Sequence, residues 1–266
     1  MAGRGRGLPI FVVDAFAERP FSGNPAAVCL LAAWPDEALL LAVAGELNLS
    51  ETAFLVGGGG DYQIRWFTPT REVDLIGHAT LAAGLVVLDQ LEPGRGSVIF
   101  RSGIETLRVE RDSRLLAMDF PALPSITVPH EATLAAALGH RPVEVRAGKH
   151  YMAIFERHSD VAALAPDMVA VAALDLPAVI ATAPAAEPGI DFVSRFFAPA
   201  NGVPEDPVSG VAHLVLVPYW AERLGKKRLV ARQLSRRGGV VIGRDRGHRV
   251  TLLGTAILVA EGRLYP

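Results

Sequence analysis

The sequence predicts an α+β protein made of two similar halves, each with several strands around one buried helix. A run beginning at Phe67, FTPTREVDLIGHATLAAGLVVL, matches one beginning at Phe197, FAPANGVPEDPVSGVAHLVLVPYWAERL. Each run contains Phe-x-Pro, an acidic loop, a glycine and an apolar helix. Both helices are apolar on nearly every side, which is typical of helices in the middle of a domain. The length of 266 residues is sufficient for two domains of roughly 100–150 residues.

Short runs rich in β-branched and aromatic residues predict the strands of the first half. They span 9–13, 26–31, 52–56, 62–67, 97–101, 104–110 and 115–120. Four glycines between the third and fourth runs predict a hairpin. One helix is expected after Pro35, in DEALLLAVAGELN, and the central apolar helix over 77–90.

The second half repeats this plan, since SGIETLRVER from Ser102 resembles RGGVVIGRDR from Arg237. The Pro-rich stretch 120–129 marks the boundary. The predicted domains are therefore 1–122 and 123–266, and we expect the last residues to pack back on the first domain. The most membrane-like stretch, 161–183, contains Pro and Asp and predicts amphipathic helix and loop. A small-molecule site is expected in the cleft between the halves.

Composition excludes several classes of protein. The net charge is -2, and the densest basic run, 223–228, is expected to be solvated surface, so no nucleic-acid partner is predicted. The single cysteine, Cys29, excludes an internal disulfide or a Cys-based metal site and indicates a cytoplasmic setting. No histidine ligand spacing, dinucleotide fingerprint or phosphate loop is present. The start, MAGRGRG, precedes no apolar run. We expect no metal, nucleotide or flavin cofactor and no membrane partner.

Three segments carry the candidate chemistry: ELNLSETAFL, EVDLIGHATLAAG and PEDPVSGVAHL. Glu51 precedes the apolar run TAFLV, where a half-buried carboxylate would exchange a proton near neutral pH. Considered alone, a glutamate entering a strand is usually an exposed surface residue. Gly77 and Gly210 begin the two apolar helices, whose first N–H groups can hold a carboxylate or an enolate-like oxygen. The alternative is that both glycines only permit tight entry into a buried helix.

His78 and Asp206 accompany these glycines. His78 lies in the first turn of its helix, where the dipole favours the neutral imidazole as a hydrogen-bonding group. Asp206 is followed by Pro207, a good N-cap with proline at the first helical position. A carboxylate at this point can also share a proton with Glu51, and both roles are compatible.

With VDAFAERPFSGNPAAV near the start, these segments resemble the signature segments of the PhzF-like (phenazine-biosynthesis-like) family, in order and through nearly the whole chain. The resemblance implies the diaminopimelate epimerase fold, in which each domain wraps a curled, mostly antiparallel sheet around its central helix. It also implies a site between the domains and a homodimer. The functional residues that it implies are catalytic Glu51, His78 and Asp206 and substrate-binding Ser50, Gly77, Ser209, Gly210 and Asn24.

The chain departs from the family pattern at two points. Val211 stands where many relatives have serine or another small residue, so one hydroxyl to the substrate is missing. Ile76 and Val208 lie where the related epimerase has its paired thiols, which rules out two-thiol racemisation; Cys29 is expected to be a core residue.

The preferred function is a cofactor-free isomerase in which Glu51 shifts a proton within a small carboxylate. One alternative is an epimerase or racemase with Glu51 and Asp206 as two bases, and another is a binding protein without turnover.

Overall fold

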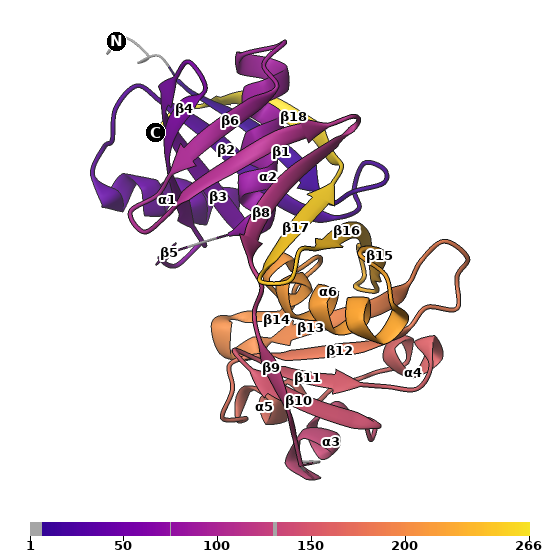
Figure 1. Cartoon of the computed structure of the whole chain (residues 1–266). Coiled ribbons are helices and arrows are strands. Elements are labelled where there is room, and N and C mark those ends of the chain that lie inside the picture. Colours follow the sequence, from indigo (N-terminus) through magenta and orange to yellow (C-terminus); the bar gives the residue numbers. More distant parts are fainter. Residues whose placement is uncertain (1–6, 75, 130–131) are drawn as a thin grey trace. The chain divides into compact units, whose positions relative to one another are not determined.

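The computed structural model describes residues 7–74, 76–129 and 132–266, so most of the basic start lies outside it (Figure 1). The chain forms two compact units. One contains Met1–Asp119 together with Leu253–Pro266, and the other contains Phe120–Leu252. Both units combine a mixed sheet with a buried helix, so the predicted α+β class is confirmed.

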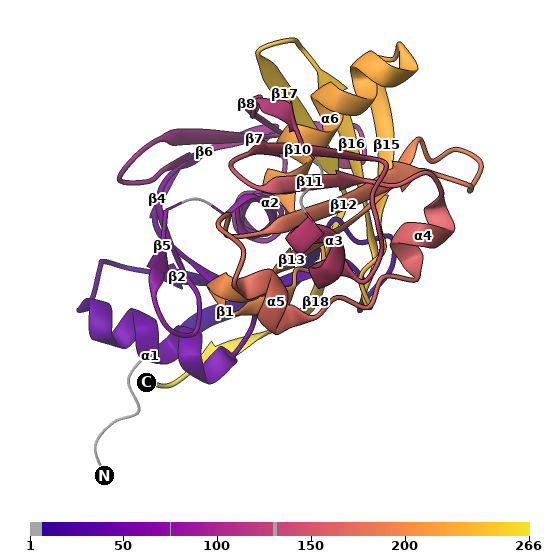
Figure 2. The same ribbon diagram turned by 90° about the horizontal axis from the view of Figure 1, so that it is seen from below.

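The sheet of the first unit curves around helix α2, as Figure 2 shows. Its strand order is β18-β1-β2-β3-β4-β6-β7-β8, with β5 beside β4. The pairs β2–β3 and β4–β6 are parallel and the others antiparallel. The strands are β1 (Leu8–Ala15), β2 (Asn24–Leu31), β3 (Glu51–Gly58), β4 (Asp61–Phe67), β5 (Glu72–Val73), β6 (Ser97–Arg101), β7 (Thr106–Asp112), β8 (Leu115–Pro121) and β18 (Ala256–Leu264).

Helix α2 (Gly77–Leu85) continues as a π-helical segment over Val86–Leu91. Every residue from His78 to Leu88 is buried, as expected for a helix that is apolar on all sides. Helix α1 (Glu37–Leu47) buries Leu40 and Val43 in a separate cluster with Cys29. Burial raises the pKa of the Cys29 thiol to about 12, so the thiol stays protonated in the core.

The second unit has the strand order β9-β10-β11-β12-β13-β15-β16, with β14 also beside β13. Its central helix is α6 (Gly210–Leu224). The strands are β9 (Ser125–Val128), β10 (Glu144–Gly148), β11 (Tyr151–Ile154), β12 (Val179–Pro184), β13 (Phe192–Ala198), β14 (Val203–Glu205), β15 (Arg228–Gln233) and β16 (Gly239–Asp245), followed along the chain by β17 (Arg249–Gly254). The shorter helices are α3 (Ala132–Leu138), α4 (His158–Ala162), α5 (Met168–Ala172) and a 3₁₀ turn over Pro199–Asn201.

The two sheets have the same pairing pattern, which confirms the predicted duplication. Strands β10, β11, β12, β13, β15 and β16 repeat β1, β2, β3, β4, β6 and β7. In both series the second and third strands are parallel, as are the fourth and fifth. The short strand β14 pairs with β13 as β5 pairs with β4.

The expectation for 161–183 is wrong at its C-terminal end. Instead of helix and loop, Val179–Pro184 forms β12, five of whose six residues are buried. A strand covered on both faces is apolar without alternation, so periodicity does not distinguish it from a buried helix. Within the described ranges, no helix combines the length and apolar character needed to cross a membrane.

The helix–sheet contact is built in opposite ways in the two units. Gly84 and Val217 occupy equivalent helix positions, since each lies seven residues after the glycine that begins its helix, Gly77 in α2 and Gly210 in α6. Val109 of β7 and Gly243 of β16 occupy equivalent strand positions, since they pair with the matching residues Val98 and Leu229. A Cβ on Gly84 would lie 2.5 Å from Val109 Cγ1, and one on Gly243 would overlap Val217. One unit therefore has its glycine on the helix and the other on the strand.

We expect Gly84→Ala to lower the free energy of unfolding. Overpacking costs about 1–3 kcal/mol, which exceeds the gain of about 1 kcal/mol in helix propensity. Adding Val109→Ala should restore part of the loss, because it removes the methyl groups that the new Cβ meets. Urea denaturation of both single variants and the double variant measures this coupling. Strictly additive losses would contradict the contact.

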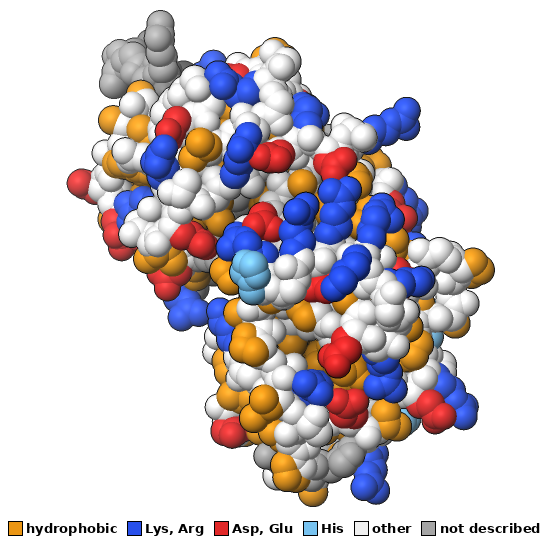
Figure 3. All heavy atoms as spheres, in the orientation of Figure 1, with side chains coloured by type: hydrophobic (Ala, Val, Ile, Leu, Met, Phe, Trp, Pro, Cys, Tyr) orange, Lys and Arg blue, Asp and Glu red, His pale blue; other side chains and the backbone are white. Residues whose placement is uncertain are grey.

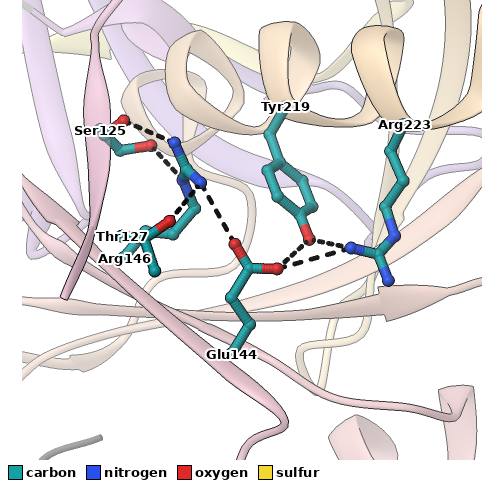
Figure 4. Close-up of polar contacts among 6 residues, drawn as sticks. All are labelled: Ser125, Thr127, Glu144, Arg146, Tyr219 and Arg223. Carbon is teal, nitrogen blue, oxygen red and sulfur yellow. Dashed lines mark hydrogen bonds and ion pairs between the residues drawn. The ribbon is translucent and has the colours of Figure 1, made fainter. Parts of the chain in front are cut away.

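A polar network fixes the C-terminal part of α6 to β10 (Figure 4). Glu144 accepts hydrogen bonds from Arg146 Nη1 at 3.2 Å and from the Tyr219 hydroxyl at 3.0 Å. The Arg146 and Arg223 guanidinium groups lie 5.6 and 5.7 Å from the centre of the Tyr219 ring. Burial, reinforced by Glu144, raises the pKa of Tyr219 to about 12, so the hydroxyl remains a donor.

Basic side chains at the surface are interspersed with acidic ones on the face in Figure 3. In the basic run 223–228, Lys226 lies 2.5 Å from Asp191 and Lys227 lies 2.8 Å from Asp245. These pairs fit the expectation that the run is solvated surface.

Candidate functional site

Glu51 is the first residue of β3 and pairs in parallel with Ala26 of β2. It is 8% exposed, and its Oε2 lies 2.9 Å from His78 Nε2. His78 is the second residue of α2 and is 5% exposed. The start of a strand and the start of the central helix thus bring together two groups that can exchange a proton.

Asn24 orients the imidazole. It is fully buried at the start of β2, and its Nδ2 donates a hydrogen bond of 3.2 Å to His78 Nδ1. Because Nδ1 accepts, the proton of the neutral ring is on Nε2, which faces Glu51. The imidazole of His78 therefore lies between two side chains, with Asn24 hydrogen-bonded to Nδ1 and Glu51 close to Nε2.

The loop between β1 and β2 places Asn24. Gly23 has a φ of 69°, and a Cβ there would overlap the Ala15 carbonyl, so glycine is required. The buried Asp14 carboxylate accepts a hydrogen bond of 2.7 Å from the Phe21 N–H and so holds this loop. The conformation of the loop, rather than any feature of Asn24 itself, brings this residue to His78.

Ser50 and Gly77 flank the pair. Ser50 immediately precedes β3 and is half-buried. Gly77 is the first residue of α2, and no side chain among the described residues caps this helix at Ile76. The first turn of α2 is therefore without the side-chain acceptor that usually occupies a helix start.

Asp206, Ser209 and Gly210 lie in the second unit, where α6 begins at Gly210. Ser209 is the N-cap, and its Oγ accepts a hydrogen bond of 3.3 Å from Ala212 N. The alternative that Asp206 caps the helix with Pro207 as its first residue is wrong, because the helix begins three residues later. Asp206 instead donates its backbone N–H to the Phe196 carbonyl at 3.0 Å.

The second unit has no counterpart of the Glu51–His78 pair. Phe67 and Phe197 are equivalent, and they pair with Thr52 and Val179, respectively. The residues that precede these partners, Glu51 and Ala178, are therefore also equivalent. His78 follows Gly77 as Val211 follows Gly210. The duplicated fold therefore carries this carboxylate–imidazole pair in the first unit and apolar side chains at the equivalent positions of the second.

Two further side chains at the start of α6 have no signal in the sequence. Gln233, fully buried at the end of β15, bonds to the backbone of both Asp206 and Ser209. His213 is also fully buried, and its Nδ1 donates to the Ser209 carbonyl at 2.7 Å. Burial lowers the pKa of His213 to about 4, so the ring is neutral near pH 7. In the described parts of the chain, no three His, Cys, Asp or Glu residues form a group able to hold a metal ion.

Known proteins resemble the chain over nearly its whole length. The family model "Phenazine biosynthesis-like protein" matches residues 13–262. An uncharacterized isomerase of Pseudomonas aeruginosa is 50% identical and covers 97% of this chain and 98% of its own. A crystal structure of a PhzF-family phenazine biosynthesis protein from Enterococcus faecalis is 42% identical, with a TM-score of 0.94 over 98% of this chain and 100% of its own.

A likeness of fold alone extends further. A probable proline racemase from Agrobacterium radiobacter, at 8% identity, has a TM-score of 0.63 over 97% of this chain and 92% of its own. The epimerase-like fold and the resemblance that the signature segments indicated are thereby confirmed. The chain belongs to the phenazine biosynthesis-like family.

Proposed function

We propose that this protein is a cofactor-independent isomerase that moves a proton within a small carboxylate-bearing substrate, with Glu51 as general acid and base. The observation that carries this proposal is the contact of 2.9 Å between Glu51 Oε2 and His78 Nε2, with Asn24 behind the imidazole. The isomerase name of the Pseudomonas aeruginosa relative supports the class of reaction.

The reaction needs one base that works twice. The Glu51 carboxylate takes a proton from a carbon next to an activating group, and the electron pair of the broken C–H bond moves into that group. The protonated Glu51 then returns the proton to another carbon on the same face. General acid–base catalysis of this kind contributes roughly 10²–10⁴-fold to the rate.

His78 and Asn24 support Glu51 in both steps. The Nε2 of His78 lies 2.9 Å from Oε2, where the imidazole keeps the carboxylate in position between the two proton transfers. Asn24 keeps the imidazole in the tautomer that can donate. The uncapped first turn of α2, beginning at Gly77, is suited to hold the substrate carboxylate or the oxygen that gains negative charge.

Label retention tests the one-base mechanism. A screen of small cyclic and amino carboxylates in deuterated water, followed by NMR, would first identify a substrate that exchanges. The same substrate carrying deuterium at the reacting carbon is then converted in ordinary water. A single base should return part of the label to the product.

Complete loss of label in the first turnover would instead favour a two-base epimerase with Asp206 as the second base. Absence of exchange for every carboxylate that binds would favour the binding protein. Either result would contradict the proposed function.

A further inference from the structure

We propose that Gln233 is a positioning residue for this reaction, because its side-chain amide closes the turn that carries Asp206 and starts α6. This inference rests on the proposed function and on the part in the reaction that the family resemblance implies for Asp206, as a site residue beside the single base Glu51. The Gln233 Nε2 donates to the Asp206 carbonyl at 2.7 Å, and its Oε1 accepts from the Ser209 N–H at 2.9 Å. One fully buried amide thus joins both ends of the segment 206–209.

The other backbone groups of the turn are also fixed. Asp206 N–H donates to Phe196 O at 3.0 Å, and Ser209 O accepts from His213 Nδ1 at 2.7 Å. With the Gln233 bonds, both backbone polar groups of each end residue therefore have a partner. The direction of the Asp206 side chain and of the first N–H groups of α6 depends on this turn.

Ser235 makes a second, weaker attachment in the middle of the turn. Its hydroxyl donates to the Pro207 carbonyl at 2.7 Å and accepts from Gly238 N at 3.0 Å. Ser235 is half-buried, whereas Gln233 is fully buried, so loss of the Ser235 hydroxyl leaves groups that water can reach. The two side chains together hold the turn from β15 and the loop that follows it.

The duplicated fold shows that this amide is not a general requirement of the architecture. The residue of the first unit that is equivalent to Gln233 is Ser102. Each follows an arginine, Arg232 or Arg101, that pairs with the same position of the neighbouring strand, Val193 or Gln63. The Ser102 hydroxyl donates to Glu105 O at 3.1 Å, within its own loop. The amide is therefore special to the unit that carries Asp206 and the Ser209–Gly210 helix start.

The chemistry of glutamine suits this place. The turn presents one acceptor and one donor, and an uncharged amide supplies the complementary pair without burying a charge. Leucine has a similar size but neither group, so it leaves a carbonyl and an N–H unpaired and frees the turn to move. Misplacement of a reacting group by about 1 Å can cost about 10²-fold in rate.

The test compares Gln233→Leu, Ser235→Ala and a control, Thr182→Val. Thr182 is also fully buried in the second unit and accepts from Trp220 Nε1 at 3.0 Å, but it does not bond to the turn. All variants are assayed well below their melting temperatures, with kcat and KM for proton exchange measured separately. Hydrogen exchange of the Ser209 amide is measured in parallel.

We expect Gln233→Leu to lower kcat about 10²-fold while KM rises by a small factor, since the Ser209 cap of α6 remains. Ser235→Ala should lower kcat by a smaller factor. The Ser209 amide should exchange faster in Gln233→Leu, and Thr182→Val should lose stability without either change. A kcat close to that of the wild type in Gln233→Leu, or an equal loss in Thr182→Val, would overturn the proposal.

The amide measurement separates this proposal from the proposed function. If the wild-type protein turns over no substrate but the Ser209 amide loses protection in Gln233→Leu, the proposed function fails and the attachment of the turn stands. If protection is unchanged, the positioning role fails whatever the activity. Should Gln233→Leu not fold, unchanged kcat in Ser235→Ala would count against the turn as a determinant of the rate.

Discussion

Glu51→Gln is expected to abolish most of the turnover while the protein stays folded. The amide keeps the shape of the side chain, and its carbonyl oxygen can lie against His78 Nε2 as the carboxylate does, but it cannot take up and return a proton. A sole proton carrier should contribute at or above the upper end of roughly 10²–10⁴-fold. Proton exchange followed by NMR measures the loss, and calorimetry of ligand binding should show near-normal affinity.

Stability separates a catalytic Glu51 from a structural one. The side chain is 8% exposed, and a neutral amide costs less to bury than a carboxylate, so the melting temperature should be unchanged or slightly higher. Glu37→Gln is a suitable control, because Glu37 is an exposed glutamate of the same unit. If Glu51→Gln unfolds the protein, Glu51 is structural. If turnover stays within a few-fold of the wild type, another group carries the proton.

The second large effect concerns His213 and acid. Burial lowers its pKa from 6.5 to about 4 in the folded protein, although the hydrogen bond to the Ser209 carbonyl acts in the opposite direction. The unfolded chain therefore binds a proton at higher pH than the folded chain does. The free energy of unfolding should be constant above about pH 7 and fall as the pH drops from 6.5 towards 4, by about 3 kcal/mol for this residue.

His213→Asn isolates this contribution. The asparagine Nδ2 can replace the imidazole Nδ1 as donor to the Ser209 carbonyl, and asparagine does not titrate in this range. Urea denaturation between pH 7 and 4 should show a smaller decline for the variant than for the wild type. His150, whose pKa is also lowered to about 4 by burial and by Lys149, is unchanged in both proteins and cancels. Parallel pH curves would show that His213 does not control acid stability.

Much of the fold could be predicted because the signals are local. The apolar runs at 77–90 and after Gly210 predict buried helices, and both lie at the centre of their units. The repeated Phe-x-Pro, glycine and helix pattern predicts the duplication that the strand pairings show. The prediction failed for β12, where burial on both faces removes the alternation that identifies a strand.

The candidate site was predictable only in part. A glutamate before an apolar strand and a glycine before an apolar helix indicated Glu51 and the start of α2. That His78 Nε2 lies 2.9 Å from Glu51, and that Asn24 lies behind it, depends on three segments meeting in one unit. Gln233 had no signal at all, because a glutamine that follows an arginine at the end of a strand resembles any surface residue.

The sequence by itself determined most strands of the first half, the two central helices, the shared plan of the two halves and the family. These properties follow from the order of apolar and polar residues along short stretches. Only the tertiary structure decided that β18 pairs with β1, that glycine and valine exchange places between the two helix–sheet contacts, and that one buried amide holds the turn at Asp206. The physical reason is that packing can bring residues from distant parts of the chain to pair with a strand edge, fill a void or hydrogen-bond to a buried backbone group.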